Sequence, residues 1–129
     1  MKLVTDTHAL VWYLSGEKRL SRRARQAFHH ADAGRWTVHV PAIVLYEISM
    51  LERLGRLRLS YRELRDQLAL RPGLPIEPTT AEDVDETRSL GTIADPFDRL
   101  VAATALRLSA PLITCDETLS AAPAVRTYW

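Results

Sequence analysis

Short apolar segments alternate with helical segments along the chain, and this alternation restricts the fold more than any other feature of the sequence. Apolar strands without polar alternation are typical of a parallel sheet that is covered on both faces. Such strands are predicted at residues 2–5, 36–40, 74–77, 111–114 and 125–128. Because helical sequence separates the first four strands from one another, we predict one α/β domain over residues 1–129, with a central parallel sheet between helices.

Helices are predicted between these strands, and capping residues mark where several of them begin. Ser21 is a suitable N-cap, and Pro41 suits the first position of a helix. Asp95 is an N-cap candidate that is followed directly by proline. Thr79 and Glu82 have the spacing of a capping box. The predicted helices cover residues 7–14, 22–33, 42–54, 61–70, 80–90 and 97–108.

Two carboxylates follow predicted strands. Asp6 comes directly after the first strand, and Asp116 follows the strand at residues 111–114. Ligands of open parallel sheets bind beyond the carboxyl ends of the strands, so both side chains are candidates for a functional site. A simpler interpretation is that each aspartate caps the helix or turn that follows it.

Two further carboxylates lie on apolar faces of predicted helices. Glu47 has only apolar residues three and four positions away on either side, and Asp98 has apolar residues at the same spacings after it. A carboxylate in such a place needs a partner, because an isolated buried charge is costly. An arginine could be that partner for Glu47, but Arg99 points about 100° away from Asp98 around the helix. Asp95 shares the face of Asp98, although helix capping also explains it.

Together these four acids suggest a metal site. Asp6, Glu47, Asp98 and Asp116 come from four separate segments and would meet at one edge of the sheet. Like charges at close range raise one another's pKa unless a cation lies among them. Oxygen ligands suit Mg²⁺ or Mn²⁺, and such a metal can activate water for attack on a phosphodiester. The pattern therefore predicts a metal-dependent nuclease.

The net charge of +1 conceals an uneven distribution. Residues 17–35 and residues 53–71 each carry a net charge of +4, whereas residues 77–98 carry −6. Basic segments beside an acidic metal site would attract the phosphates of RNA. Solvated helix faces are the simpler explanation, and some of these arginines could instead face a protein partner.

Composition excludes several other classes of protein. The single Cys115 excludes a disulfide framework and a cysteine-based zinc site. No apolar stretch approaches the roughly 20 residues of a membrane span, and none resembles a signal peptide, so we expect a cytoplasmic protein without a membrane partner. A phospho-acceptor signalling domain is disfavoured, since it would be expected to carry a lysine at a late strand end and the only lysines are Lys2 and Lys18.

The sequence resembles the PIN-domain ribonucleases, specifically the VapC-type toxins of bacterial toxin–antitoxin pairs, over essentially its whole length. Residues 95–105, DPFDRLVAATA, are the most specific match. The resemblance implies that four acids bind the metal and that nearby hydroxyls support them. The matching segments are residues 5–12, 41–49, 95–105 and 112–116. The implied acids are Asp6, Glu47, Asp98 (rather than Asp95) and Asp116, and the implied supporting hydroxyls are those of Thr7 and Thr114.

The same resemblance implies a three-layer α/β/α sandwich and a Mg²⁺- or Mn²⁺-dependent endoribonuclease that acts on RNA. It also implies a homodimer and a small antitoxin whose C-terminal segment covers the active site. Two alternatives remain within the family. One is a nuclease of RNA maturation or decay, and the other is a non-catalytic binding module, which the presence of all four acids disfavours.

Overall fold

The computed structural model describes residues 1–129, and a five-stranded parallel sheet forms its centre. The strand order is β3-β2-β1-β4-β5, so the first strand lies in the middle of the sheet. This arrangement confirms the predicted parallel sheet. The strands are β1 (Lys2–Thr5), β2 (Thr37–Pro41), β3 (Ile76–Glu77), β4 (Leu112–Ile113) and β5 (Thr127–Tyr128).

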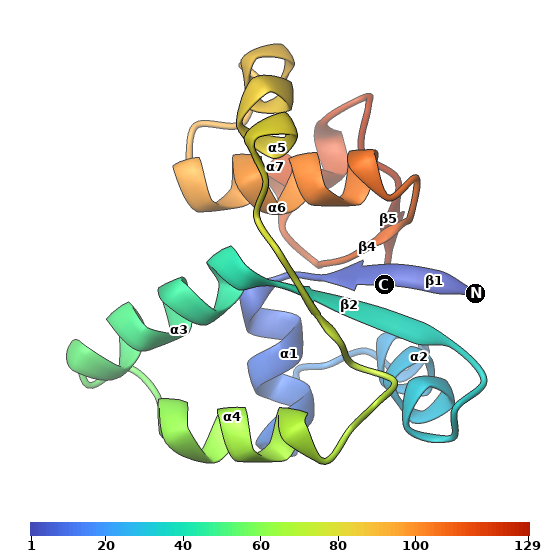
Figure 1. Ribbon diagram of the computed structural model, residues 1–129, viewed down its shortest axis with the longest axis vertical. Helices are drawn as coiled ribbons and strands as arrows, with labels where there is room; N and C mark the ends of the chain where they lie inside the picture. The colour runs from blue at the N-terminus through green and yellow to red at the C-terminus, as the bar shows by residue number, and fades with distance from the viewer.

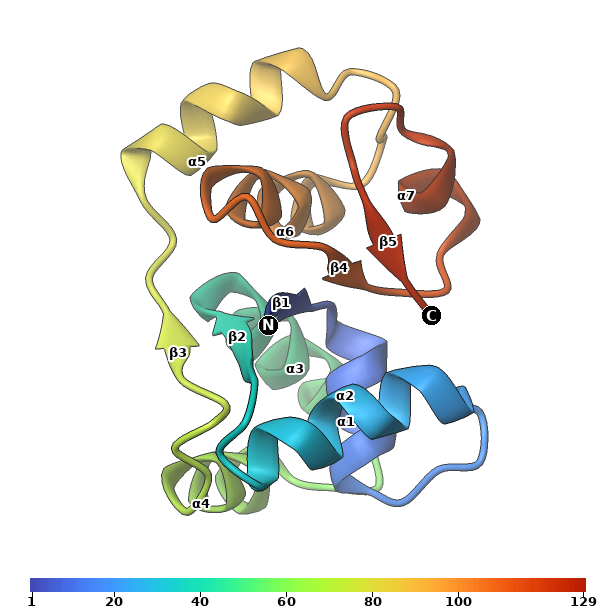
Figure 2. The ribbon, with the colours of Figure 1, turned by 90° about the vertical axis from the view of Figure 1, so that its right-hand side faces the viewer.

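Helices cover both faces of the sheet, as Figures 1 and 2 show. The first four helices lie on one face and the last three on the other, which confirms the expected three-layer sandwich. None of the helices has the length and hydrophobicity that a membrane crossing requires. The helices are α1 (Thr7–Leu14), α2 (Arg22–Asp32), α3 (Ala42–Arg53), α4 (Tyr61–Ala69), α5 (Ala81–Glu86), α6 (Pro96–Arg107) and α7 (Glu117–Ala121), and a short 3₁₀ helix covers Thr87–Ser89.

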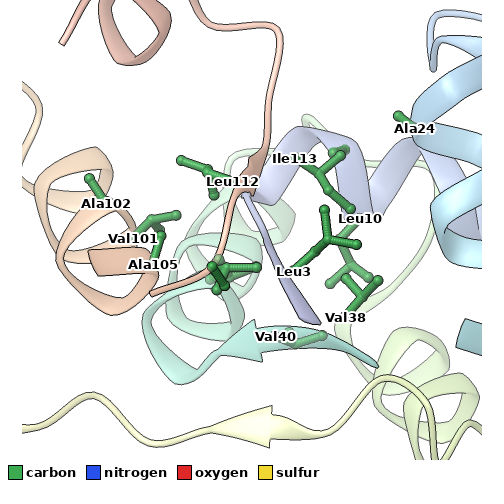
Figure 3. Close-up of a cluster of buried hydrophobic side chains, with 14 of the residues drawn as sticks. Leu3, Leu10, Ala24, Val38, Val40, Val101, Ala102, Ala105, Leu112 and Ile113 are labelled. Carbon is green, nitrogen blue, oxygen red and sulfur yellow. The ribbon is translucent and has the colours of Figure 1, made fainter. Parts of the chain in front are cut away.

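The central strands divide the core into two parts, one on each face of the sheet. Leu3 and Ile113 point toward Leu10 of α1, whereas Leu112 points toward Val101 of α6 (Figure 3). All five side chains are almost completely buried. Because successive residues of a strand face opposite sides, short apolar strands contribute to both parts.

Two details of the predicted helix starts are wrong. The capping box of α5 pairs Thr80 with Asp83 rather than Thr79 with Glu82. The predicted helix over residues 80–90 consists of α5 and the 3₁₀ helix, which ends at Ser89. Pro41 is the last residue of β2 and precedes α3, because its backbone is extended and not helical. By contrast, Ser21 and Asp95 cap α2 and α6 as predicted.

A buried ion pair joins α5 to α6. The carboxylate of Asp83, which is fully buried, accepts a hydrogen bond of 2.7 Å from Nε of Arg107. The same guanidinium donates to Glu77 at the end of β3, at 2.9 Å. Burial alone would raise the pKa of Asp83, but Arg107 and the backbone of Thr80 outweigh it and leave the pKa lowered. This network attaches the edge strand and α5 to α6.

Candidate active site

The carboxyl ends of the central strands lie at one edge of the sheet, where α1, α3 and α6 begin (Figure 1). Asp6 follows β1 and is buried, with an exposed fraction of 8%. Its Oδ1 accepts a hydrogen bond of 2.8 Å from the backbone of Ala9, so it caps α1. Asp116 is exposed, and its Oδ1 caps α7 through the backbone of Leu119, at 2.9 Å. Both aspartates therefore cap a helix, as the simpler interpretation predicts, and in each of them the capping hydrogen bond occupies Oδ1.

Glu47 lies in the second turn of α3 and is half-buried, as its apolar surroundings predict. None of the ion pairs in the structure includes Glu47, so the alternative of an arginine partner is wrong. Instead, the buried hydroxyl of Thr7 donates a hydrogen bond to Oε1 of Glu47. Thr7 follows Asp6 directly, so this bond fixes the α3 carboxylate beside the α1 carboxylate.

Asp95 and Asp98 occupy different environments at the start of α6. Asp95 is exposed, and its Oδ1 accepts a hydrogen bond of 3.0 Å from the backbone of Asp98. Asp98 is half-buried, and no side-chain hydrogen bond occupies its carboxylate. Asp95 therefore positions the first turn of α6, whereas the carboxylate of Asp98 remains available.

The charges of these acids act on one another. The pKa of Asp98 is raised to about 7, mainly by burial and further by the like charges of Asp95, Asp116, Glu47 and Asp6. The Asp98 carboxyl group thus lies within electrostatic range of every other candidate acid. The four predicted metal ligands, contributed by segments far apart in sequence, therefore lie near enough to one another for their charges to act on Asp98.

Burial also raises the pKa of Asp6, and the charge of Glu47 contributes to the increase. Hydrogen bonds from Thr114 and from the backbone of Ala9 act in the opposite direction. Thr114 has a second contact, since its Oγ1 accepts a hydrogen bond of 3.0 Å from the backbone of Asp116. Thr114 therefore lies beside both strand-end aspartates, since it contacts the backbone of Asp116 and lowers the pKa of Asp6.

The donor set fits a hard divalent cation. Every candidate ligand is a carboxylate oxygen, and a cation would relieve the repulsion that raises the pKa of Asp98. No three His, Cys, Asp or Glu side chains are close enough to hold a metal ion by themselves. Mg²⁺ commonly keeps several waters and only one or two carboxylate ligands, so this wider spacing suits a partly hydrated ion.

A cavity of about 370 Å³ reaches Thr7, the hydrogen-bond partner of Glu47, although none of the four carboxylates lines it. Thr7 lies on its wall, together with residues of α1 and of the segment between α3 and α4. Three arginines line it, Arg19 from the first basic segment of the sequence and Arg56 and Arg58 from the second. The sequence did not predict this cavity, because the order of residues in the two basic segments does not show which of their arginines line a common surface.

Known proteins match this fold and this chain. The family model of the PIN domain matches residues 3–125. Ribonuclease VapC22 of Mycobacterium tuberculosis (strain ATCC 25618 / H37Rv) is 32% identical over 120 residues, which cover 91% of this chain and 88% of that protein.

Two solved structures share the fold at lower identity. VapBC2 from Rickettsia felis, bound to a DNA fragment from its promoter, matches with a TM-score of 0.73 and 18% identity over 100% of both chains. A toxin–antitoxin complex from Klebsiella pneumoniae matches with a TM-score of 0.64 and 22% identity, over 97% of this chain and 96% of that chain. These two structures show the shared fold. The match to the PIN model over nearly the whole chain and the 32% identity to VapC22 show that the protein belongs to the PIN-domain family and is of the VapC type.

Proposed function

We propose that this protein is a divalent-metal-dependent endoribonuclease that acts as the toxin of a toxin–antitoxin pair. The observation that carries the proposal is the placement of four carboxylates near the carboxyl edge of a PIN-type sheet, where Thr7 holds Glu47 next to Asp6 and the like charges act on Asp98. The 32% identity to ribonuclease VapC22 supports the same activity. Mg²⁺ or Mn²⁺ is the cofactor that the carboxylate donors favour.

Asp6, Glu47, Asp98 and Asp116 would hold the cation, directly or through water. When bound, such a cation lowers the pKa of coordinated water and stabilises charge on phosphate oxygens. The carboxylate of the buried Asp6 is held in place, because its Oδ1 accepts a hydrogen bond from the first turn of α1. Thr7 orients the carboxylate of Glu47, and Thr114 accepts a hydrogen bond from the backbone of Asp116.

Asp98 has a distinct role in this proposal. With a pKa of about 7, its carboxyl group holds a proton in a large part of the population at neutral pH when no cation is present. Binding of a cation would release that proton and make the carboxylate a ligand. Metal affinity should therefore increase with pH, because the ligand form of Asp98 becomes more populated.

An RNA-cleavage assay on the purified protein tests the proposal. We expect cleavage of single-stranded RNA with Mn²⁺ or Mg²⁺ and none with EDTA. Asp6→Asn and Asp98→Asn should each abolish cleavage while the fold, checked by circular dichroism, is retained. The substitution Asp85→Asn is the matched control, because Asp85 is exposed and lies on α5, away from the site. Cleavage by Asp98→Asn at the wild-type rate would refute the assignment.

An antitoxin partner is part of the proposal. The matched complex from Klebsiella pneumoniae contains a toxin and an antitoxin, which supports a similar partner for this chain. Co-expression with the product of a neighbouring small gene, followed by co-purification, tests it. The complex should lack the RNA cleavage that the separated protein shows.

A homodimer is also proposed, and an exposed apolar stripe on α3 supports it. Tyr46, Met50 and Leu54 are spaced four residues apart, with exposed fractions of 58%, 37% and 63%. The ring of Tyr46 lies 6.0 Å from that of Phe97 at the start of α6, which extends the apolar surface across two helices. A second copy of the chain could cover this stripe with its own through a two-fold axis.

A further inference from the structure

We infer that the cavity beside the acidic cluster is a subsite for one nucleotide of the RNA substrate, adjacent to the bond that is cleaved. This inference rests on the proposed ribonuclease function and deepens it. The volume of the cavity, about 370 Å³, is at the small end of the range for ligand pockets, which suits a single nucleotide.

The position of the cavity connects it to the candidate active site. Thr7, whose hydroxyl holds Glu47, is part of its wall. Leu51 is another part, and it lies one helical turn after Glu47 on the same face of α3, a rise of about 6 Å. A nucleotide in the cavity would therefore be next to a phosphate held at the carboxylates.

The charge of the cavity suits a phosphate. Arg56 and Arg58 are exposed, and neither takes part in any ion pair of the structure. The only ion pair of Arg19 is a long contact of 4.0 Å with Glu17, which is the one acid of the lining. Three guanidinium groups against one carboxylate leave a local excess of positive charge. Arginine binds phosphate oxygens with two parallel hydrogen bonds, so these groups suit the RNA backbone.

An aromatic pair offers a surface for the base. Trp12 lies on the cavity wall, and its ring is 5.8 Å from that of His8, which is exposed. The guanidinium of Arg19 lies 4.8 Å from the centre of the Trp12 ring. Bases stack on aromatic rings and on arginine planes in proteins that bind single-stranded nucleic acid. The cavity thus combines the two kinds of group that such binding uses.

The two basic segments of the sequence meet here. Arg19 belongs to residues 17–35, and Arg56 and Arg58 belong to residues 53–71. Other arginines of the same segments, such as Arg35 and Arg62, are exposed and do not line the cavity. The fold therefore separates cavity arginines from surface arginines of equal charge, and this separation provides a matched control.

RNA binding in EDTA, followed by fluorescence anisotropy of a labelled single-stranded RNA containing all four bases, tests the inference. The double variant Arg56→Gln with Arg58→Gln is compared with Arg35→Gln with Arg62→Gln, which removes the same charge. We expect the cavity variant to bind at least roughly tenfold more weakly and to lose about 0.7 of salt-dependence slope per phosphate contact, with little change in the control. Trp12→Phe should reduce the quenching of tryptophan fluorescence by RNA.

Equal effects of the two double variants on affinity and on slope would overturn the inference, because they would show only general attraction. The same holds if the cavity variant binds and cleaves RNA normally but no longer binds the co-purified antitoxin, since the cavity would then be a protein-binding site. A wild-type protein that neither binds nor cleaves RNA would instead refute the proposed function itself. Thermal unfolding of each variant confirms that the fold is intact.

Discussion

The hydroxyl of Thr7 in α1 donates a hydrogen bond to Oε1 of Glu47 in α3, across 40 positions of the sequence. Thr7 is buried and directly follows Asp6, so a small side chain next to one candidate ligand fixes the orientation of another. Hydrogen bonds of this kind commonly determine how well carboxylates bind a metal.

Replacing Thr7 should therefore impair catalysis without unfolding the protein. Thr7→Val keeps the shape of the side chain and removes the donor, and we expect a loss of about 10–100-fold in cleavage rate and in Mn²⁺ affinity. Thr7→Ser keeps the hydroxyl and should retain most of both. Titration of Mn²⁺ against cleavage rate measures the effect. A Thr7→Val enzyme with wild-type metal affinity would show that Thr7 only packs in the core.

The raised pKa of Asp98 should be visible in the stability of the metal-free protein. Because the folded state raises the pKa of Asp98 from 3.8 to about 7, it binds a proton more tightly there than the unfolded chain. Stability in EDTA should therefore fall as the pH rises from about 4 through 7. Asp98→Asn removes the repelled carboxylate and should flatten this decline, with a melting temperature several degrees above wild type at pH 8.

Mn²⁺ provides the complementary measurement. Added at pH 8, it should raise the melting temperature of the wild type, since it binds the folded state alone. The increase should be much smaller in Asp98→Asn. An equal increase in both proteins would place the metal elsewhere, and an unchanged pH profile in the variant would contradict the raised pKa.

Much of the fold could be predicted because its signals are local. The apolar runs and the capping side chains of Ser21 and Asp95 act within a few residues, so they indicate an element before any packing is known. The start of α5 was misplaced for the opposite reason. Thr79 and Glu82 have the same spacing as Thr80 and Asp83, and the contacts of Asp83 with Arg107 and Thr104 on α6 favour the second pair.

The site was predictable in part, for a related reason. The apolar neighbours of Glu47 and Asp98 show that these carboxylates face inward, and parallel strands bring Asp6 and Asp116 to one edge. The sequence could not show which group holds Glu47, because the hydroxyl of Thr7 is brought there by the packing of α1 and α3. The meeting of Arg19 with Arg56 and Arg58 depends on the same packing. The metal-ligand roles themselves stay predictions.

The ion pair of Asp83 should contribute strongly to stability. Asp83→Asn leaves Arg107 without its buried partner, and we expect a loss of about 3 kcal/mol in the free energy of unfolding. Glu82→Gln, at the exposed neighbouring position, is the control and should change stability by less than about 0.5 kcal/mol. Urea unfolding at pH 7 measures both.

The dependence of that loss on pH has a definite sign. The folded protein lowers the pKa of Asp83 below its ordinary value of 3.8, so its stabilisation is complete above that value. It is lost as the pH falls through the lower, folded value. The difference between Asp83→Asn and wild type should therefore shrink in acid. A difference that stays constant down to complete protonation would show that packing, and not charge, is responsible.

The apolar stripe on α3 predicts how a homodimer can be separated. Placing charge at both ends of the stripe, with Tyr46→Arg and Leu54→Arg, puts like charges opposite one another in a two-fold interface and removes its apolar contacts. We expect the variant to be a monomer at concentrations where the wild type is a dimer, as measured by light scattering coupled to size-exclusion chromatography.

Leu70→Arg is the matched control, because Leu70 is 83% exposed at the end of α4, outside the stripe. It should leave the dimer intact. Dissociation by Leu70→Arg alone would move the interface to α4, and a Tyr46→Arg, Leu54→Arg variant that remains dimeric would exclude α3 as the contact surface.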